Sequence, residues 1–237
     1  MTSYRRSTMP TAPALDQLVG EIAETASRLD ETSQRIGVAL IRRLAQGAPV
    51  AVGALAGDAG LPEAQVADRL DQMPGVFRDD DGRVVGYFGI TVAEMGKHRL
   101  HLDGHTVSAW CAWDTLFLPD VIGRTVQVTS RTPDHDDPIS LTVTPGGPRE
   151  VTPPGTVVTF VPPKADFVNN TIASFCHYVH FFPSPESAAA WTAEHPGTFA
   201  VPLADAYELA EVLTQTVFGK VVPARRQRIA DDDPGSA

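Results

Sequence analysis

Long apolar runs and leader-like segments are missing from this sequence. A helix that crosses a membrane needs about 18 or more consecutive apolar residues, and no such run occurs among the 237 residues. Arg5 and Arg6 are not followed by the apolar segment that completes a secretory signal peptide. We therefore expect a cytoplasmic protein with no membrane contact.

Positive charge is scarce as well. The chain has 19 Lys and Arg against 29 Asp and Glu, which gives a net charge of -10. Contacts to nucleic-acid phosphates depend on Lys and Arg, so this balance argues against a general nucleic-acid-binding protein. The glycine-containing segments also lack the spacing of a phosphate-binding loop, and nothing in the sequence indicates a nucleotide ligand.

Cysteine occurs only twice, as Cys111 and Cys176. No Cys-x-x-Cys pair is present, and the spacing of His177 and His180 after Cys176 is not a recognised zinc motif. A disulfide between the two cysteines would suit a secreted chain, whereas a cytoplasmic chain keeps its thiols reduced. We therefore expect two free thiols, which are either inert packing residues or reactive groups.

The first part of the chain predicts a small helical module. Residues 1–13 are polar and contain two prolines, so we expect a disordered tail there. Apolar residues recur at helical spacing over 15–44, and Pro62 is well placed to begin a further helix. Two short apolar segments around a turn at 79–82 complete the outline of a winged helix-turn-helix over residues 14–97.

DNA binding and a purely structural role are both compatible with that outline. The segment in the position of a recognition helix, residues 61–73, carries Glu63, Asp68 and Asp71 against Arg69 alone. Phosphates repel an acidic face. We therefore interpret the module as a structural element that packs on the rest of the protein.

Residues 98–222 predict a sheet-rich core with flanking helices. Ser184 and the proline after it are typical of a helix N-terminus, and a last amphipathic helix is expected over 203–218. A flexible tail over 223–237 is expected to follow. The fold class is therefore α+β, with a winged-helix-like N-terminal module followed by a sheet-rich catalytic core. The expected strands include residues 106–110, 121–130, 139–143 and 156–161.

The residues around the first cysteine combine a thiol with a carboxylate. If a helix begins at Cys111, Asp114 lies on the same helical face. A thiol near a helix N-terminus ionises more easily, and Asp114 could accept its proton and later return it. Trp110 and Trp113 would shield the site as candidate walls of a substrate pocket, and lower polarity raises the pKa of a carboxylic acid.

The second cysteine must be brought to this site by the fold. Residues 175–182 resemble a strand, which would hold Cys176 rigidly. Two thiolates and one carboxylate suit a soft ion such as mercury or copper(I). A non-catalytic trap for such an ion is one interpretation, although a trap has no need of the proton donor Asp114.

These residues closely resemble the alkylmercury lyase family, also called organomercurial lyases. The resemblance extends from about residue 32 to the final helix, and the tryptophan-cysteine segment is its most specific part. The matching stretches are residues 109–119, 122–125 and 174–182, which include Trp110-Cys111-Ala112-Trp113-Asp114-Thr115-Leu116 and Phe175-Cys176-His177-Tyr178.

The resemblance implies a reaction and a set of roles. The family's catalytic cysteines fall on Cys111 and Cys176, and its catalytic aspartate falls on Asp114. They imply protonolysis of the carbon–mercury bond of R–Hg–X to R–H and Hg²⁺, with the product ion held by the same three residues. No organic cofactor is implied. Low-molecular-weight thiols or a mercuric reductase would then take the ion, as part of organomercurial detoxification.

This sequence lacks further cysteines that some members of the family have. Some relatives carry further cysteines beside the second site and in the loop around 130–137, where this chain has His177 and no cysteine. We expect this difference to affect mercury release or stability and not bond cleavage. The alternatives from other functional classes are a metal-responsive winged-helix regulator and a non-catalytic mercury or copper trap.

Overall fold

The computed structural model describes residues 20, 29–162 and 170–225. The expected tail over 1–13, most of the first expected helix and nearly all of the expected tail over 223–237 lie outside the described residues. Within the described ranges, no helix combines the length and the apolar character needed to cross a membrane.

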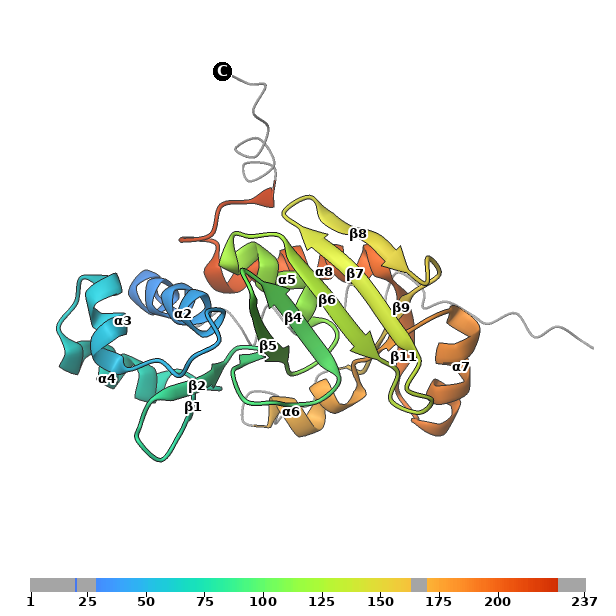
Figure 1. Cartoon of the computed structure of the whole chain (residues 1–237), viewed down its shortest axis with the longest axis horizontal. Coiled ribbons are helices and arrows are strands. Elements are labelled where there is room, and N and C mark those ends of the chain that lie inside the picture. The colour runs from blue at the N-terminus through green and yellow to red at the C-terminus, as the bar shows by residue number, and fades with distance from the viewer. Residues whose placement is uncertain (1–19, 21–28, 163–169, 226–237) are drawn as a thin grey trace, which may run out of the picture.

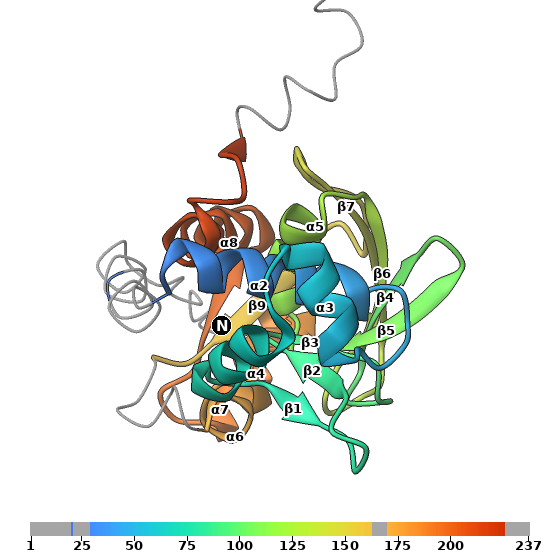
Figure 2. The same ribbon diagram turned by 90° about the vertical axis from the view of Figure 1, so that its left-hand side faces the viewer.

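The N-terminal module has the predicted winged-helix-like outline (Figures 1 and 2). Its first described helix begins after Asp30, whose carboxylate accepts a hydrogen bond from the Ser33 N–H at 2.8 Å. This cap satisfies a backbone donor that the helix cannot pair internally. The module consists of α2 (Glu31–Leu44), α3 (Val52–Ala59) and α4 (Glu63–Gln72), followed by β1 (Phe77–Arg78) and β2 (Val84–Tyr87).

An antiparallel sheet of eight strands continues from this module into the core, in the order β1-β2-β3-β5-β4-β6-β7-β8. Buried and exposed residues alternate along β6, as expected for a strand with one face on the core. The turn between β4 and β5 lies at Asp103 and Gly104. The further strands are β3 (Ile90–Thr91), β4 (His98–Leu102), β5 (His105–Ala109), β6 (Val126–Arg131), β7 (Pro138–Thr144) and β8 (Gly147–Thr152).

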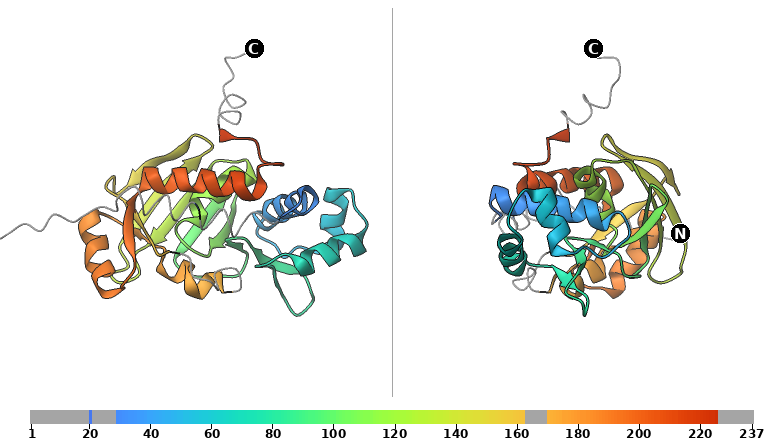
Figure 3. Two further views of the ribbon diagram at one scale, coloured as in Figure 1. Left: turned by 180° about the vertical axis from the view of Figure 1, so that it is seen from behind. Right: turned by 60° about the vertical axis from the view of Figure 1, so that its left-hand side comes forward.

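Helices and a second sheet cover the core. Helices α5 and α8 pack against each other and on the large sheet, and α8 runs across it in Figure 3. The strand expected over 121–130 begins later, because α5 continues to Ile122 and ends at Gly123 with φ +78°. The remaining elements are α5 (Asp114–Ile122), β9 (Val157–Phe160), α6 (Thr171–Ser174), η1 (Cys176–Tyr178), β10 (Phe181–Phe182), α7 (Pro185–Glu194), β11 (Phe199–Pro202) and α8 (Leu203–Phe218), with sheet order β10-β9-β11.

The turn between β2 and β3 joins the module to the core. Phe88 at this turn packs edge-on against Phe117 of α5 and Phe218 of α8, with ring centroids 5.4 and 5.1 Å apart. Arg42 of α2 donates a hydrogen bond to the Val121 carbonyl at 3.1 Å. The module is therefore packed on the core through apolar and polar contacts, as expected for a structural element.

Most of the described arginines of the module form ion pairs within the module itself. The exposed side of α4 carries Glu63, Asp68 and Asp71, and Arg69 forms an ion pair with Asp30. Carboxylates that are already close to an arginine compete with a phosphate for it. The further ion pairs are Arg35–Glu31, Arg43–Asp58, Arg78–Asp71, Arg83–Asp79 and Arg83–Asp81.

We predict that the protein does not bind duplex DNA through this module. Residues 31–97 contain seven Lys or Arg and nine Asp or Glu, so 7 − 9 gives a net charge of −2. Non-specific DNA binding at about micromolar concentration requires Lys and Arg side chains that neutralise the DNA phosphates. A gel shift with the full-length protein should show no retarded duplex at low salt, and a salt-sensitive shift would contradict the structural interpretation.

Candidate active site

The turn before α5 places Cys111 beside Asp114. Strand β5 ends at Ala109 and α5 begins at Asp114. Cys111 therefore precedes the helix, whereas the sequence had suggested that the helix begins at Cys111. Asp114 Oδ2 accepts a hydrogen bond from the Cys111 N–H at 2.7 Å. The Thr115 hydroxyl donates to the Ala112 carbonyl, also at 2.7 Å. Such side-chain bonds to nearby backbone stabilise a turn in place of a regular element.

Cys176 reaches the site from a different part of the chain. It lies in the 3-10 helix η1 that follows α6, so the expectation of a strand over 175–182 is wrong for this residue; only Phe181 and Phe182 form β10. The Ala112 N–H donates to the Val179 carbonyl at 3.1 Å. This bond ties the segment that carries Cys176 to the turn that carries Cys111.

Two sulfur atoms and a carboxylate oxygen converge at this point. The Sγ atoms of Cys111 and Cys176 and a carboxylate oxygen of Asp114 all lie within 4.8 Å of one another. Both cysteines are free thiols. In the described part of the chain this is the single group of three or more such side chains that could hold a metal ion.

The histidines form other contacts. His180 hydrogen-bonds through Nε2 to the His177 carbonyl at 2.8 Å, and His98 Nδ1 lies 2.7 Å from the Ser130 hydroxyl. None of the three joins the group around Cys111. In the described part of the chain, these histidines lie outside the candidate metal site.

Burial sets the ionisation of the carboxyl group. Asp114 is only 6% exposed, and burial raises its pKa to about 7 although hydrogen bonds from the Cys111 thiol and N–H lower it. Removal from water disfavours the charged form of an acid. Asp114 is therefore a carboxylic acid that exchanges its proton near neutral pH, as the sequence indicated.

Burial also keeps the thiols protonated, which differs from our expectation of an easily ionised thiol. The pKa of Cys111 is raised well above its usual value by burial first, and then by Cys176 and Asp114. The hydrogen bond with Cys111 lowers the pKa of Cys176, but burial and the charge of Asp114 raise it by more together. Each thiol must therefore lose its proton as it binds a metal ion.

The two tryptophans that flank Cys111 in the chain contact different aromatic rings. The ring of Trp110 is edge-on to Phe77 of β1, with centroids 5.3 Å apart. The Trp113 indole N–H donates to the Ala206 carbonyl of α8 at 2.9 Å, and its ring is 6.0 Å from that of Phe175. The two tryptophans therefore point to different neighbours, Trp110 to the N-terminal module and Trp113 to the core beside Cys176.

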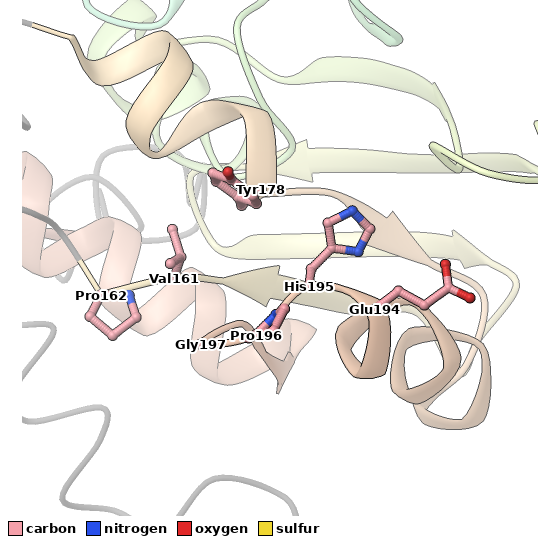
Figure 4. A pocket seen from close by; sticks show the side chains of 7 residues that line it. All are labelled: Val161, Pro162, Tyr178, Glu194, His195, Pro196 and Gly197. Carbon is pink, nitrogen blue, oxygen red and sulfur yellow. The ribbon is translucent and has the colours of Figure 1, made fainter.

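A separate hollow with a volume of about 470 Å³ lies at the other end of η1 (Figure 4). Tyr178 and His195 line it, with ring centroids 6.4 Å apart. It contains neither cysteine nor Asp114, so the reactive groups are not in this hollow. The other lining residues are Val161, Pro162, Glu194, Pro196 and Gly197.

One residue close to the group was not expected from the sequence. Gly89, in the turn between β2 and β3, packs directly on the carboxyl group of Asp114. The sequence signal was a glycine between two short strands, which marks a tight turn but not its neighbour across the fold.

Comparison with known protein families covers most of the chain. The family model described as alkylmercury lyase matches residues 92–215, and the model described as helix-turn-helix domain of alkylmercury lyase matches residues 17–89. The structure also resembles a crystal structure of the mercury-bound form of MerB2, with a TM-score of 0.70 and 26% sequence identity. That match covers 85% of this chain and 99% of the other.

Curated relatives agree with these matches. An alkylmercury lyase of Staphylococcus epidermidis is 40% identical over 174 residues, which are 73% of this chain and 79% of the relative. One of Pseudomonas putida is 39% identical over 176 residues, or 74% and 81% of the two chains. One of Bacillus cereus is 36% identical over 202 residues, or 81% and 91%. With two family models and these relatives spanning both parts of the fold, the chain belongs to the alkylmercury lyase family of enzymes.

Proposed function

We propose that Cys111, Cys176 and Asp114 carry out the reaction for which the family is named. The protein cleaves the carbon–mercury bond of an organomercurial, R–Hg–X, and produces R–H and Hg²⁺. The observation that carries this proposal is the convergence of two sulfur atoms and one carboxylate oxygen within 4.8 Å in a buried place. Soft ions such as mercury prefer sulfur ligands.

The two thiols act in turn. One sulfur bonds to mercury, X⁻ leaves, and the thiol proton is released. The second sulfur then bonds to mercury, and its proton passes through Asp114 to the carbon atom. The electron pair of the carbon–mercury bond becomes the carbon–hydrogen bond, R–H leaves, and Hg²⁺ stays on two thiolates.

Asp114 has the contacts and the acidity that this proton transfer requires. Its carboxyl group is hydrogen-bonded to the thiol and to the N–H of Cys111. A group with a pKa near the working pH both accepts and donates protons effectively, and burial raises the pKa of Asp114 to about 7. A trap for mercury would bind through the thiols alone, so the raised pKa of Asp114 favours a lyase over a trap.

The product ion must then leave a site that holds it tightly. Cys111 and Cys176 hold Hg²⁺, with an oxygen of Asp114 as a third ligand. Low-molecular-weight thiols of a reducing cytoplasm compete for the ion, and a mercuric reductase is a further acceptor. The reaction proposed here uses only these side chains and external thiols, with no organic cofactor.

The surroundings have roles of their own in this proposal. Trp110 and Trp113 form apolar walls of the substrate pocket, because they flank Cys111 in the chain and Trp113 contacts Phe175 beside Cys176. The described residues of 98–222 form the catalytic core, and the described residues of 14–97 form the winged-helix-like module. The acidic face of α4 supports a module that does not bind nucleic acid.

Replacing either thiol should abolish cleavage. We predict that Cys111→Ser and Cys176→Ser each leave the fold intact and release no hydrocarbon, because oxygen is a poor ligand for a soft ion. The measurement is benzene released from phenylmercury in the presence of excess external thiol, with circular dichroism as the control for folding. Substantial turnover by the Cys176→Ser protein would show that the second thiol has no part in the reaction.

Removing the carboxyl group should separate capture from cleavage. The Asp114→Ala protein retains both thiols, so it should still bind phenylmercury. Cleavage should fall by about 10²–10⁴-fold, the usual contribution of a general acid. Mass spectrometry should find the phenylmercury group attached to the protein. Cleavage at the wild-type rate would show that water or another group donates the proton. Loss of phenylmercury binding would show that Asp114 acts mainly by ionising the Cys111 thiol.

The raised pKa of Asp114 also predicts how stability depends on pH. Its pKa is about 7 in the folded protein against 3.8 for an unperturbed aspartic acid, so between these values the folded state keeps a proton that the unfolded state releases. The free energy of unfolding therefore falls as pH rises towards 7. A pKa shift of about three units corresponds to a change of at most roughly 4 kcal/mol in the free energy of unfolding.

Asp114→Asn should remove this dependence. The amide oxygen can still accept the Cys111 N–H, but it carries no charge. Relative to wild type, the variant should gain stability as pH rises from about 4 to about 7 in urea unfolding. A difference between the two proteins that does not change with pH would show that Asp114 is not the titrating group.

A further inference from the structure

We propose that Gly89 positions Asp114 for proton transfer, because its backbone occupies the space into which the carboxyl group would otherwise turn. The inference rests on the role proposed above for Asp114. It assigns to the N-terminal part of the chain, between β2 and β3, a direct effect on the chemistry.

The contact between the two residues leaves no room for a side chain at position 89. A Cβ atom built there would lie 2.6 Å from Oδ1 of Asp114, 2.7 Å from its Cγ and 3.0 Å from its Cβ. Carbon atoms normally approach other heavy atoms no closer than about 3.5 Å in attractive contact. Only glycine therefore allows the turn and the carboxyl group to lie this close.

The carboxyl group is held from its other side. Its Oδ2 accepts the hydrogen bond from the Cys111 N–H at 2.7 Å, while Oδ1 faces Gly89. A rotation of the side chain would break the hydrogen bond from the Cys111 N–H, and the close approach of Gly89 limits the space on the Oδ1 side. Asp114 is thus confined to the orientation in which it reaches the Cys111 thiol.

The turn that carries Gly89 cannot easily move away. The Gly89 carbonyl accepts a hydrogen bond from the Trp110 N–H at 2.9 Å, one residue before Cys111. On one side Phe88 packs against the rings of Phe117 and Phe218, and on the other Ile90 pairs with Ala109 in the sheet. The same turn therefore contacts both the thiol-bearing and the carboxyl-bearing ends of the site.

Gly89→Ala tests this role, and Gly82→Ala is the matched control. Both glycines lie in turns of the N-terminal part and have positive φ, +91° for Gly89 and +76° for Gly82. Both alanine variants therefore carry the same kind of backbone strain. A Cβ at Gly82 meets nothing within 4 Å, whereas one at Gly89 meets Asp114.

The full-length proteins are compared in single-turnover release of benzene from phenylmercury across a range of pH. Gly89→Ala should cleave roughly 10²-fold more slowly, as expected for a misplaced catalytic group, while the two thiols still capture phenylmercury by mass spectrometry. Its pH profile should also shift, because Asp114 no longer keeps its contact with Cys111. Gly82→Ala should match wild type in both rate and profile.

Asp114→Ala measured in parallel distinguishes the two proposals. Wild-type cleavage by Asp114→Ala would overturn the proposed acid, and with it any positioning role. If Asp114→Ala cleaves slowly but Gly89→Ala has the wild-type cleavage rate and pH profile, only the inference about Gly89 is overturned.

A double variant covers the case in which Gly89→Ala unfolds. Asp114→Ala removes the two atoms closest to the new Cβ, so Gly89→Ala should cost far less stability in that background than in the wild type. An equal loss of stability in both backgrounds would show that the strain is not directed at Asp114, and the inference would fail.

Discussion

The structure of the site depends on one short hydrogen bond, from the Cys111 N–H to Asp114 Oδ2 at 2.7 Å. It closes the turn between β5 and α5 and holds a carboxyl group against a thiol in a place closed to water. A carboxyl group in such a place must be hydrogen-bonded to be tolerated. The same bond that shapes the backbone therefore also fixes the acid next to the sulfur atom.

Burial around this bond raises the pKa of both kinds of group, with a different consequence for each. It raises the pKa of Asp114 to about 7, which suits proton exchange in neutral solution. It raises the pKa of both thiols too, so the free protein holds two protonated sulfur atoms. In the reaction proposed above, reactivity towards mercury then does not come from a free thiolate. It comes from the exchange of a thiol proton for a metal ion with Asp114 alongside, which couples binding to the supply of the proton.

The N-terminal module is part of this arrangement and not an appendage. The eight-stranded sheet continues from β1 and β2 into β3 and β5, so the wing of the module forms one edge of the core. Its acidic helix α4 faces away from the site, while the turn after β2 reaches Asp114. A fold resembling a DNA-binding module thus contributes packing and a close backbone contact. Arginines of the module, such as Arg69 and Arg78, form ion pairs with its own carboxylates.

The sequence by itself determined the fold class, the winged-helix-like outline and the residue types of the site, because turn residues, apolar spacing and the Cys111–Asp114 spacing are local properties. It could not determine the secondary structure at Cys176, since the apolar residues over 175–182 are compatible with either a strand or a 3-10 helix. Nor could it determine the protonated state of the thiols, because the burial that raises their pKa exists only once the core is assembled. Gly89 was equally out of reach. Its contact with Asp114 joins residues distant in the chain, and only the tertiary structure brings a turn and a carboxyl group together.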